Sequence, residues 1–196
     1  TGFTSQAMNV GELSNKGIEA SLNINIVRGD RFNWSIFGTI ATLKNRIEKL
    51  ALTPDGKPID INAGSSYQSA QVGNSYYSWY MPTWAGVNVQ TGAPEWYING
   101  VDGDKTSTYA QAKRIFQGTA LPKITGGFGT NVSYDNFFLN ANFYYVSGNK
   151  IYDQYAQFTM NSIGTNIAST IVREDIMDRW QKPGDITDVP RPYNGA

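Results

Sequence analysis

The clearest pattern in the sequence is a strict alternation of apolar and polar residues over positions 17–27, which read GIEASLNINIV. Every second side chain from Ile18 to Ile26 is apolar, whereas the side chains between them, from Glu19 to Asn25, are polar. A period of two is typical of a β-strand that has one apolar face and one wet face. We therefore predict a strand over residues 17–27.

The same alternation recurs in three further segments, at residues 32–43, 123–134 and 137–147. A polar turn at 28–31 joins the first two strands, and the dipeptide Asp135-Asn136 joins the last two. Each segment has about the 9–11 residues that a tilted membrane-spanning strand needs. The sequence therefore predicts two antiparallel hairpins.

Long intervals follow each predicted hairpin, at 44–122 and 148–196. A soluble sandwich has short turns at both ends, whereas an outer-membrane barrel has short turns at one end and long loops at the other. We therefore expect an all-β fold, namely a transmembrane antiparallel β-barrel segment with long extracellular loops. Within the two intervals, helical spacing of apolar residues also predicts short helices over 104–117 and 165–181.

The composition excludes several kinds of chemistry. The 196 residues include no His and no Cys, so the chain has no disulfide, no Cys/His zinc site, no Ser-His-Asp triad and no Cys-His dyad. The 16 Lys+Arg and 16 Asp+Glu residues balance each other, which argues against a nucleic-acid partner held by phosphate contacts. We expect no cofactor, no metal ion and no covalent chemistry.

Four groups of residues resemble motifs of SusC/RagA-type TonB-dependent outer-membrane transporters, in that family's order and over nearly the whole chain. They are Asn9–Ile24 (NVGELSNKGIEASLNI); Trp79–Trp96, which contains WAGVNVQTGAPEW; Leu121-Pro122-Lys123 with Gly126-Gly127 and then Gly148–Asp153 (GNKIYD); and Arg179-Trp180, Pro183-Gly184-Asp185 and Pro190-Arg191. Each motif is short, and their shared order makes the resemblance specific.

The resemblance implies that the chain is a fragment near the C-terminal end of a barrel of about 22 strands, of which it carries about four. The plug domain would be absent from this chain. The whole protein would lie in the cell outer membrane of a Gram-negative bacterium and import an oligosaccharide or peptide. Its implied partners are a SusD-like surface lipoprotein, TonB (through parts absent here), the remainder of the barrel and plug, and outer-membrane lipid.

Two sets of side chains are candidates for contact with a transported glycan or peptide. Aromatic rings suit the faces of sugars and tolerate a wet site, and the loop aromatics considered for substrate binding are Trp79, Tyr80, Trp84, Trp96, Tyr97 and Trp180. The alternative is that these rings pack the loops together or against a partner protein. The residues expected to face the lumen are Asn23, Asn25, Asn140 and Asn142, while Trp34, Tyr134 and Phe137 fit an interfacial aromatic girdle.

Two other classes of function stay open at this point. One is a soluble all-β glycan-binding module, and the other is a secreted carbohydrate-active enzyme that uses Glu174, Asp175 or Asp178. Asp102-Gly103-Asp104 resembles the start of a calcium loop, but the twelfth position is Lys113, which excludes an EF-hand. The barrel hypothesis requires that no further layer of protein covers the apolar side chains, which include Leu22, Ile36, Phe128 and Phe143.

Overall fold

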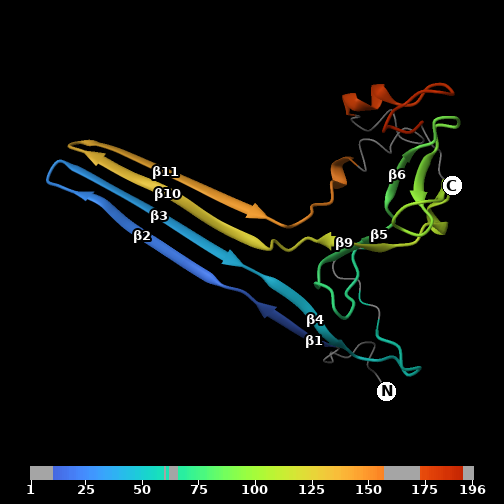
Figure 1. Ribbon diagram of the computed structural model, residues 1–196, viewed down its shortest axis with the longest axis horizontal. Coiled ribbons are helices and arrows are strands. Elements are labelled where there is room, and N and C mark those ends of the chain that lie inside the picture. Colours follow the sequence, from blue (N-terminus) through green and yellow to red (C-terminus); the bar gives the residue numbers. More distant parts are fainter. Residues whose placement is uncertain (1–10, 60, 62–65, 157–172, 192–196) are drawn as a thin grey trace, which may run out of the picture. The chain divides into compact units, whose positions relative to one another are not determined.

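A computed structural model describes residues 11–59, 61, 66–156 and 173–191 of the chain. Regular structure in these ranges consists almost entirely of β-strands (Figure 1). The all-β class predicted from the sequence is therefore confirmed. In the ranges that the structure describes, no helix is long and apolar enough to cross a bilayer.

Four long strands form one antiparallel sheet, which we call the main sheet (Figure 1). Its strands are β2 (Glu19–Arg28), β3 (Phe32–Thr42), β10 (Ile124–Tyr134) and β11 (Phe137–Ser147), in the spatial order β11-β10-β3-β2. Their bounds agree with the four expected strands to within two residues. The two hairpins pair with each other through β3 and β10.

The register of the main sheet places the apolar side chains together on one face. Leu22, Gly38, Phe128 and Phe143 lie in a single row across the four strands. The Phe128 and Phe143 rings stack with centroids 5.1 Å apart. Leu22 is 62% exposed, Phe128 54% and Phe143 57%, so no second layer covers this apolar face within the described residues.

Glycines in β10 make room for aromatic rings from neighbouring strands. A Cβ atom at Gly129 would lie 2.6 Å from Phe37 Cζ, and one at Gly126 would lie 2.6 Å from the Tyr145 hydroxyl. Both aromatic residues are cross-strand partners of the glycine concerned. Phe37, which interrupts the polar positions of its strand, is therefore accommodated because its ring lies over backbone that carries no side chain.

An ion pair links the two short turns of the main sheet. Arg31 Nε donates to Asp135 Oδ1 at 2.7 Å, and Arg31 Nη2 donates to Asp135 Oδ2 at 2.5 Å. The guanidinium also lies 5.8 Å from the centroid of the Tyr134 ring. Asp135 has a φ of 50°, a left-handed conformation that Asp tolerates in a tight hairpin turn. The hydrogen bonds from Arg31 lower the pKa of Asp135 below its ordinary value.

The chain divides by its internal contacts into two compact units. The first unit comprises Thr1–Trp79 and Gly118–Lys150. Besides the main sheet it contains a ribbon in which β1 (Gly11–Lys16) pairs with β4 (Lys44–Leu50). The inner face of this ribbon forms a small core, because Ile47 and Ala70 are buried and partly buried Leu50, Ile61 and Tyr76 pack against them.

The second unit comprises Tyr80–Gln117 and Ile151–Ala196. It contains a three-stranded sheet formed by β6 (Trp84–Val87), β7 (Pro94–Tyr97) and β8 (Lys105–Thr106). Strands β5 (Ser78–Met81) and β9 (Ile115–Thr119) pair with each other. Each of them contains one point at which the chain passes from one unit to the other.

The helix predicted over 104–117 is wrong. The segment instead contains β8, the short 3₁₀-helix η1 (Tyr109–Gln111) and most of β9. Its apolar spacing reflects packing of strands, since Phe116 lies in β9 with its ring centroid 4.9 Å from that of Tyr80. Much of the helix predicted over 165–181 lies outside the described residues, and the described remainder contains the 3₁₀-helix η2 (Glu174–Asp178).

Candidate functional site

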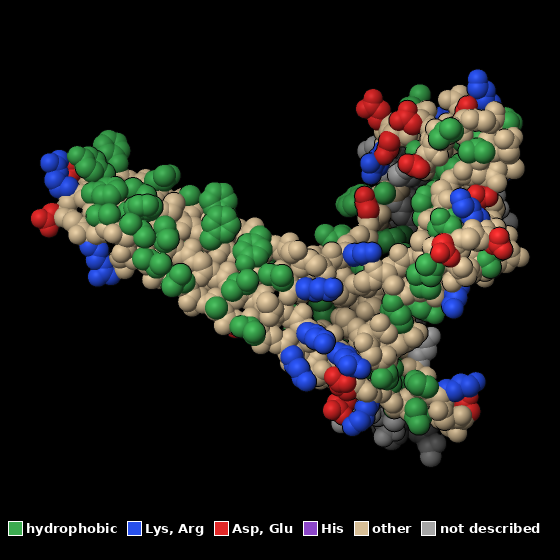
Figure 2. Space-filling view, viewed as in Figure 1, with side chains coloured by type: hydrophobic (Ala, Val, Ile, Leu, Met, Phe, Trp, Pro, Cys, Tyr) green, Lys and Arg blue, Asp and Glu red, His purple; other side chains and the backbone are tan. Residues whose placement is uncertain are grey.

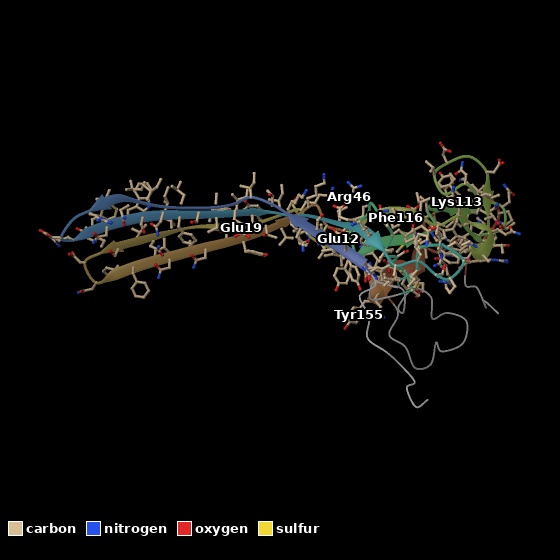
Figure 3. All side chains as sticks on the ribbon, turned by 90° about the horizontal axis from the view of Figure 1, so that it is seen from below. Glu12, Glu19, Arg46, Lys113, Phe116 and Tyr155 are labelled. Atoms are coloured by element: carbon tan, nitrogen blue, oxygen red, sulfur yellow. The ribbon has the colours of Figure 1, made fainter. Side chains whose placement is uncertain are left out.

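The polar face of the main sheet is the first candidate surface. Its middle rows are Asn25, Ser35, Asn131 and Asn140, and next to them Asn23, Phe37, Gly129 and Asn142. The four asparagines expected in a lumen therefore share one face, opposite the apolar face. Figure 3 views the main sheet close to edge-on, with side chains projecting from both faces.

A shallow groove runs over this polar face near the short turns. It has a volume of about 480 Å³, and amide and hydroxyl side chains line much of it, among them Asn25, Asn33, Asn131 and Asn140. Amides both donate and accept hydrogen bonds and carry no charge. Phe138, which is 80% exposed, adds an apolar side chain to the groove. Arg28 and Asp30 also line the groove, which can therefore contact both uncharged polar groups and charged ones.

The second candidate surface is a set of three aromatic rings in the second unit, which we call the aromatic ladder. Trp84 pairs with Trp96 across β6 and β7, and their ring centroids lie 6.0 Å apart at an interplanar angle of 77°. The Trp96 and Tyr109 rings lie 5.1 Å apart at 87°. Trp84 is 43% exposed and Tyr109 is 40% exposed. The ladder thus presents edge-to-face rings that are partly open to solvent.

Tyr97 does not join the ladder. It follows Trp96 along β7, and successive side chains of a strand point to opposite faces. The Lys105 ammonium lies 5.8 Å from the centroid of the Tyr97 ring and donates a hydrogen bond of 3.0 Å to the Ala85 carbonyl oxygen. Tyr97 therefore packs beneath a cation on the other face of the small sheet.

The other three aromatic candidates hold loop segments in place. Tyr80 packs against Phe116, and Trp79 Nε1 donates to the Lys150 carbonyl oxygen at 2.8 Å. Trp180 Nε1 donates to the Val89 carbonyl oxygen at 3.0 Å, and its ring fills the place that a Cβ atom would take at Gly92. Each of these three residues therefore has a structural role inside the loops.

The structure brings together Trp84 and Trp96 from the six predicted aromatic residues and adds Tyr109. Tyr109 was expected in a helix, and no local signal in the sequence indicates that it packs on Trp96. The contact depends on the pairing of β7 with β8, in which Thr106 lies opposite Trp96. A short chain segment then carries Tyr109 back over that indole ring.

The acidic residues considered for hydrolysis lie at η2. Asp175 Oδ2 binds Arg173 Nη2 at 2.7 Å, and Arg173 Nη1 also lies 3.7 Å from Asp153 Oδ2. Asp102 lies in a turn whose backbone N–H groups donate to the Asn99 side chain. Across the part of the chain that the structure describes, no group of three or more His, Cys, Asp or Glu residues is arranged to hold a metal ion.

Comparison with known proteins finds related sequences that match nearly the whole chain. The chain is 28% identical to TonB-dependent receptor P3 of Formosa agariphila, over 98% of this chain and 20% of that protein. It is 29% identical to TonB-dependent receptor P26 of the same organism, over 97% of this chain and 20% of that protein. No family model matches the chain. The chain spans about a fifth of the length of these curated relatives.

Solved structures of related transporters are also similar to this chain. The structure of the RagAB peptide transporter is similar to the whole chain with a TM-score of 0.81 and 27% identity, over 21% of that transporter chain. The RagAB peptide importer in its open-open state gives a TM-score of 0.80 and 28% identity, again over 100% of this chain and 21% of the other. The resemblance to SusC/RagA-type TonB-dependent transporters is thereby confirmed, and this chain is homologous to a segment of these receptors.

Proposed function

We propose that the intact protein is a TonB-dependent nutrient importer of the outer membrane and that this chain forms about four strands of its barrel wall with the attached external loops. One observation carries the proposal: an uncovered apolar face and a polar face alternate on the same four strands. Its homologues are receptors and transporters rather than enzymes, which supports a function in uptake and not in catalysis.

The apolar face is suited to contact lipid. Leu22, Phe128 and Phe143 are more than half exposed, and in a soluble protein a contiguous apolar surface of this kind would face water at a cost in free energy. In a closed barrel, neighbouring strands satisfy every backbone hydrogen bond at the two edges of the sheet. This argument disfavours the soluble glycan-binding module considered as an alternative.

Aromatic side chains near the short turns support a membrane boundary at that end of the sheet. Trp34 Nε1 donates to Thr130 Oγ1 at 2.9 Å, so the polar edge of the indole is satisfied while its ring stays on the apolar face. The Phe32 and Tyr134 rings lie 6.5 Å apart, and Phe137 is 79% exposed. Rings of this kind gather at the interfaces of outer-membrane barrels.

The polar face is proposed to line the lumen, where its asparagines contact substrate or the plug. The aromatic ladder on the loops is proposed to contact substrate or a SusD-like surface lipoprotein that covers the loops. RagAB, which is similar in structure, is named as a peptide transporter, and we propose an oligopeptide or oligosaccharide as the substrate. TonB would supply energy through other parts of the protein.

An uptake experiment tests this function. Cells that express the intact protein, and cells that lack it, are given a set of fluorescent oligopeptides and oligosaccharides, with and without a protonophore that abolishes TonB-coupled energy. We expect accumulation of at least one compound that requires both the protein and the proton gradient. Accumulation that is unchanged when the protein is removed would refute the proposal.

A further inference from the structure

The apolar face of the main sheet continues into a charged face of the ribbon. The change occurs where β1 leads into β2 and where β3 leads into β4. Even-numbered side chains are apolar from Ile18 to Ile24, but the next even-numbered residue towards the N-terminus is Lys16. Odd-numbered side chains are mostly polar in β2 and β3. On the odd-numbered side of the ribbon, by contrast, Ile47 is buried and only 2% exposed. Alternation along the strands therefore places a charged surface in line with the apolar face.

Three cations make up this surface, which we call the basic patch: Lys16, Lys44 and Arg46. Lys16 and Lys44 are directly opposite each other in the pairing of β1 with β4. Like charges in that position destabilise a sheet. Figure 2 shows Lys and Arg side chains gathered over β1 and β4, in the same view as the apolar side chains of the main sheet.

The carboxylate of Glu48 lies close to the basic patch. Glu48 accepts a hydrogen bond of 2.6 Å from Ser14 Oγ, and Arg46 Nε lies 3.7 Å from Glu48 Oε2. The Ser14 hydrogen bond, and then the charges of Arg46, Lys16 and Lys44, lower the pKa of Glu48. Within the described residues, neither lysine forms a salt bridge. The patch therefore keeps an excess of positive charge.

The position of the patch along the strand matches the level of lipid headgroups. Lys16 precedes Leu22 by six residues, which at about 3.3 Å per residue is about 20 Å along the strand. A strand tilt of about 40° reduces this distance to about 15 Å along the bilayer normal. That is slightly more than half the height of the apolar band of a barrel, which is about 25 Å tall. If Leu22 lies near the bilayer centre, Lys16 and Lys44 reach the membrane surface on the side of the long loops.

We propose that the basic patch binds phosphate groups of lipid headgroups at that surface. The inference rests on the proposed function, because lipid contact with the apolar face is what brings the patch to the headgroups. A phosphate between Lys16 and Lys44 removes their mutual repulsion, and the guanidinium fork of Arg46 matches phosphate oxygens. Continuity with the apolar face favours a lipid over a free anion or an acidic protein.

The experiment measures lipid binding to the intact protein in phosphatidylcholine nanodiscs. Diphosphoryl lipid A, lipid A without its phosphates, and inorganic phosphate are titrated separately, and bound lipid is quantified by native mass spectrometry. The test variant carries Lys16→Gln and Lys44→Gln. A matched control removes two exposed loop lysines, through Lys57→Gln and Lys182→Gln. Since each basic residue near an anionic surface contributes about five-fold, we expect about thirty-fold weaker binding of diphosphoryl lipid A in the test variant alone.

A charge reversal separates lipid binding from stability. Lys16→Glu creates a cross-strand pair of opposite charges with Lys44, which stabilises the ribbon, and it should nevertheless weaken lipid A binding. Three results would overturn the inference: equal binding of lipid A with and without phosphates, unchanged binding in the double variant, or equally tight binding of inorganic phosphate. A wild-type protein that does not enter nanodiscs at all would overturn the proposed function as well, before any lipid is added.

Discussion

Replacement of Leu22 by Arg should destabilise the protein in a bilayer far more than the same replacement at Asn23. Leu22 is 62% exposed on the apolar face and lies opposite Gly38, whose lack of a side chain leaves no partner there for a new charge. Leu22 lies six residues before the end of its strand at Arg28. At about 3.3 Å per residue and a strand tilt of about 40°, this is about 15 Å along the bilayer normal. Arg at the middle of the apolar band costs about 2–4 kcal/mol.

The measurement is guanidinium-induced unfolding of the intact protein in phospholipid vesicles, followed by tryptophan fluorescence. Asn23→Arg is the matched control because Asn23 is the next residue along the same strand and lies on the polar face. The control should lose less than about 0.5 kcal/mol, as is usual for a substitution in a wet environment. Equal losses at the two positions would contradict lipid contact on the apolar face.

Three further predictions concern contacts within the described residues. Because Arg31 lowers the pKa of Asp135 below 3.8, the ion pair should stabilise the turns fully above that pH and weaken only as the pH falls further. Asp135→Asn should therefore flatten the pH dependence of unfolding measured under acid, and an unchanged slope would contradict this. Gly129→Val should cost about 1–3 kcal/mol, because its Cβ would lie 2.5 Å from the Ala141 carbonyl oxygen and 2.6 Å from Phe37 Cζ; in chemical unfolding, Phe37→Ala should recover only the part of this loss that the ring causes. Trp96→Ala should speed hydrogen exchange of β7 and β8, since each lost ring contact is worth about 0.5–1.5 kcal/mol; protection equal to wild type would show that the ladder does not stabilise the loop.

The faces of the main sheet were predictable because a period of two assigns every side chain of a strand to one side. The alternation from Ile18 to Ile24 needed no knowledge of tertiary structure. The same reasoning cannot detect an irregularity in the pairing of neighbouring strands. The register shifts between Asn25 and Val27, so Val27 rather than Ile26 lies opposite Trp34, although the alternation had placed Ile26 on the apolar face.

The elements of the long loops were less predictable because their strands are short and their partners are distant in the sequence. Strand β9 pairs with β5, and this pairing takes precedence over the helical spacing of Tyr109, Ala112 and Phe116. The aromatic composition of the loops indicated that rings would be important there. It could not distinguish Trp84 and Trp96, which form the ladder, from Trp180, which packs against Gly92.

The central claim is that alternate side chains of the main sheet contact lipid, and a scan of accessibility along β2 tests it most directly. Single cysteines carrying a nitroxide label are placed in turn at residues 20–25 of the intact protein in vesicles, after any Cys elsewhere in that protein has been replaced; the 196 residues of this chain contain none. Collision rates are measured with oxygen, which concentrates in the bilayer, and with a water-soluble nickel chelate. Oxygen accessibility should peak at Ala20, Leu22 and Ile24, with the opposite pattern for nickel. Low accessibility to both reagents at these three positions, or the absence of a two-residue period, would contradict the claim.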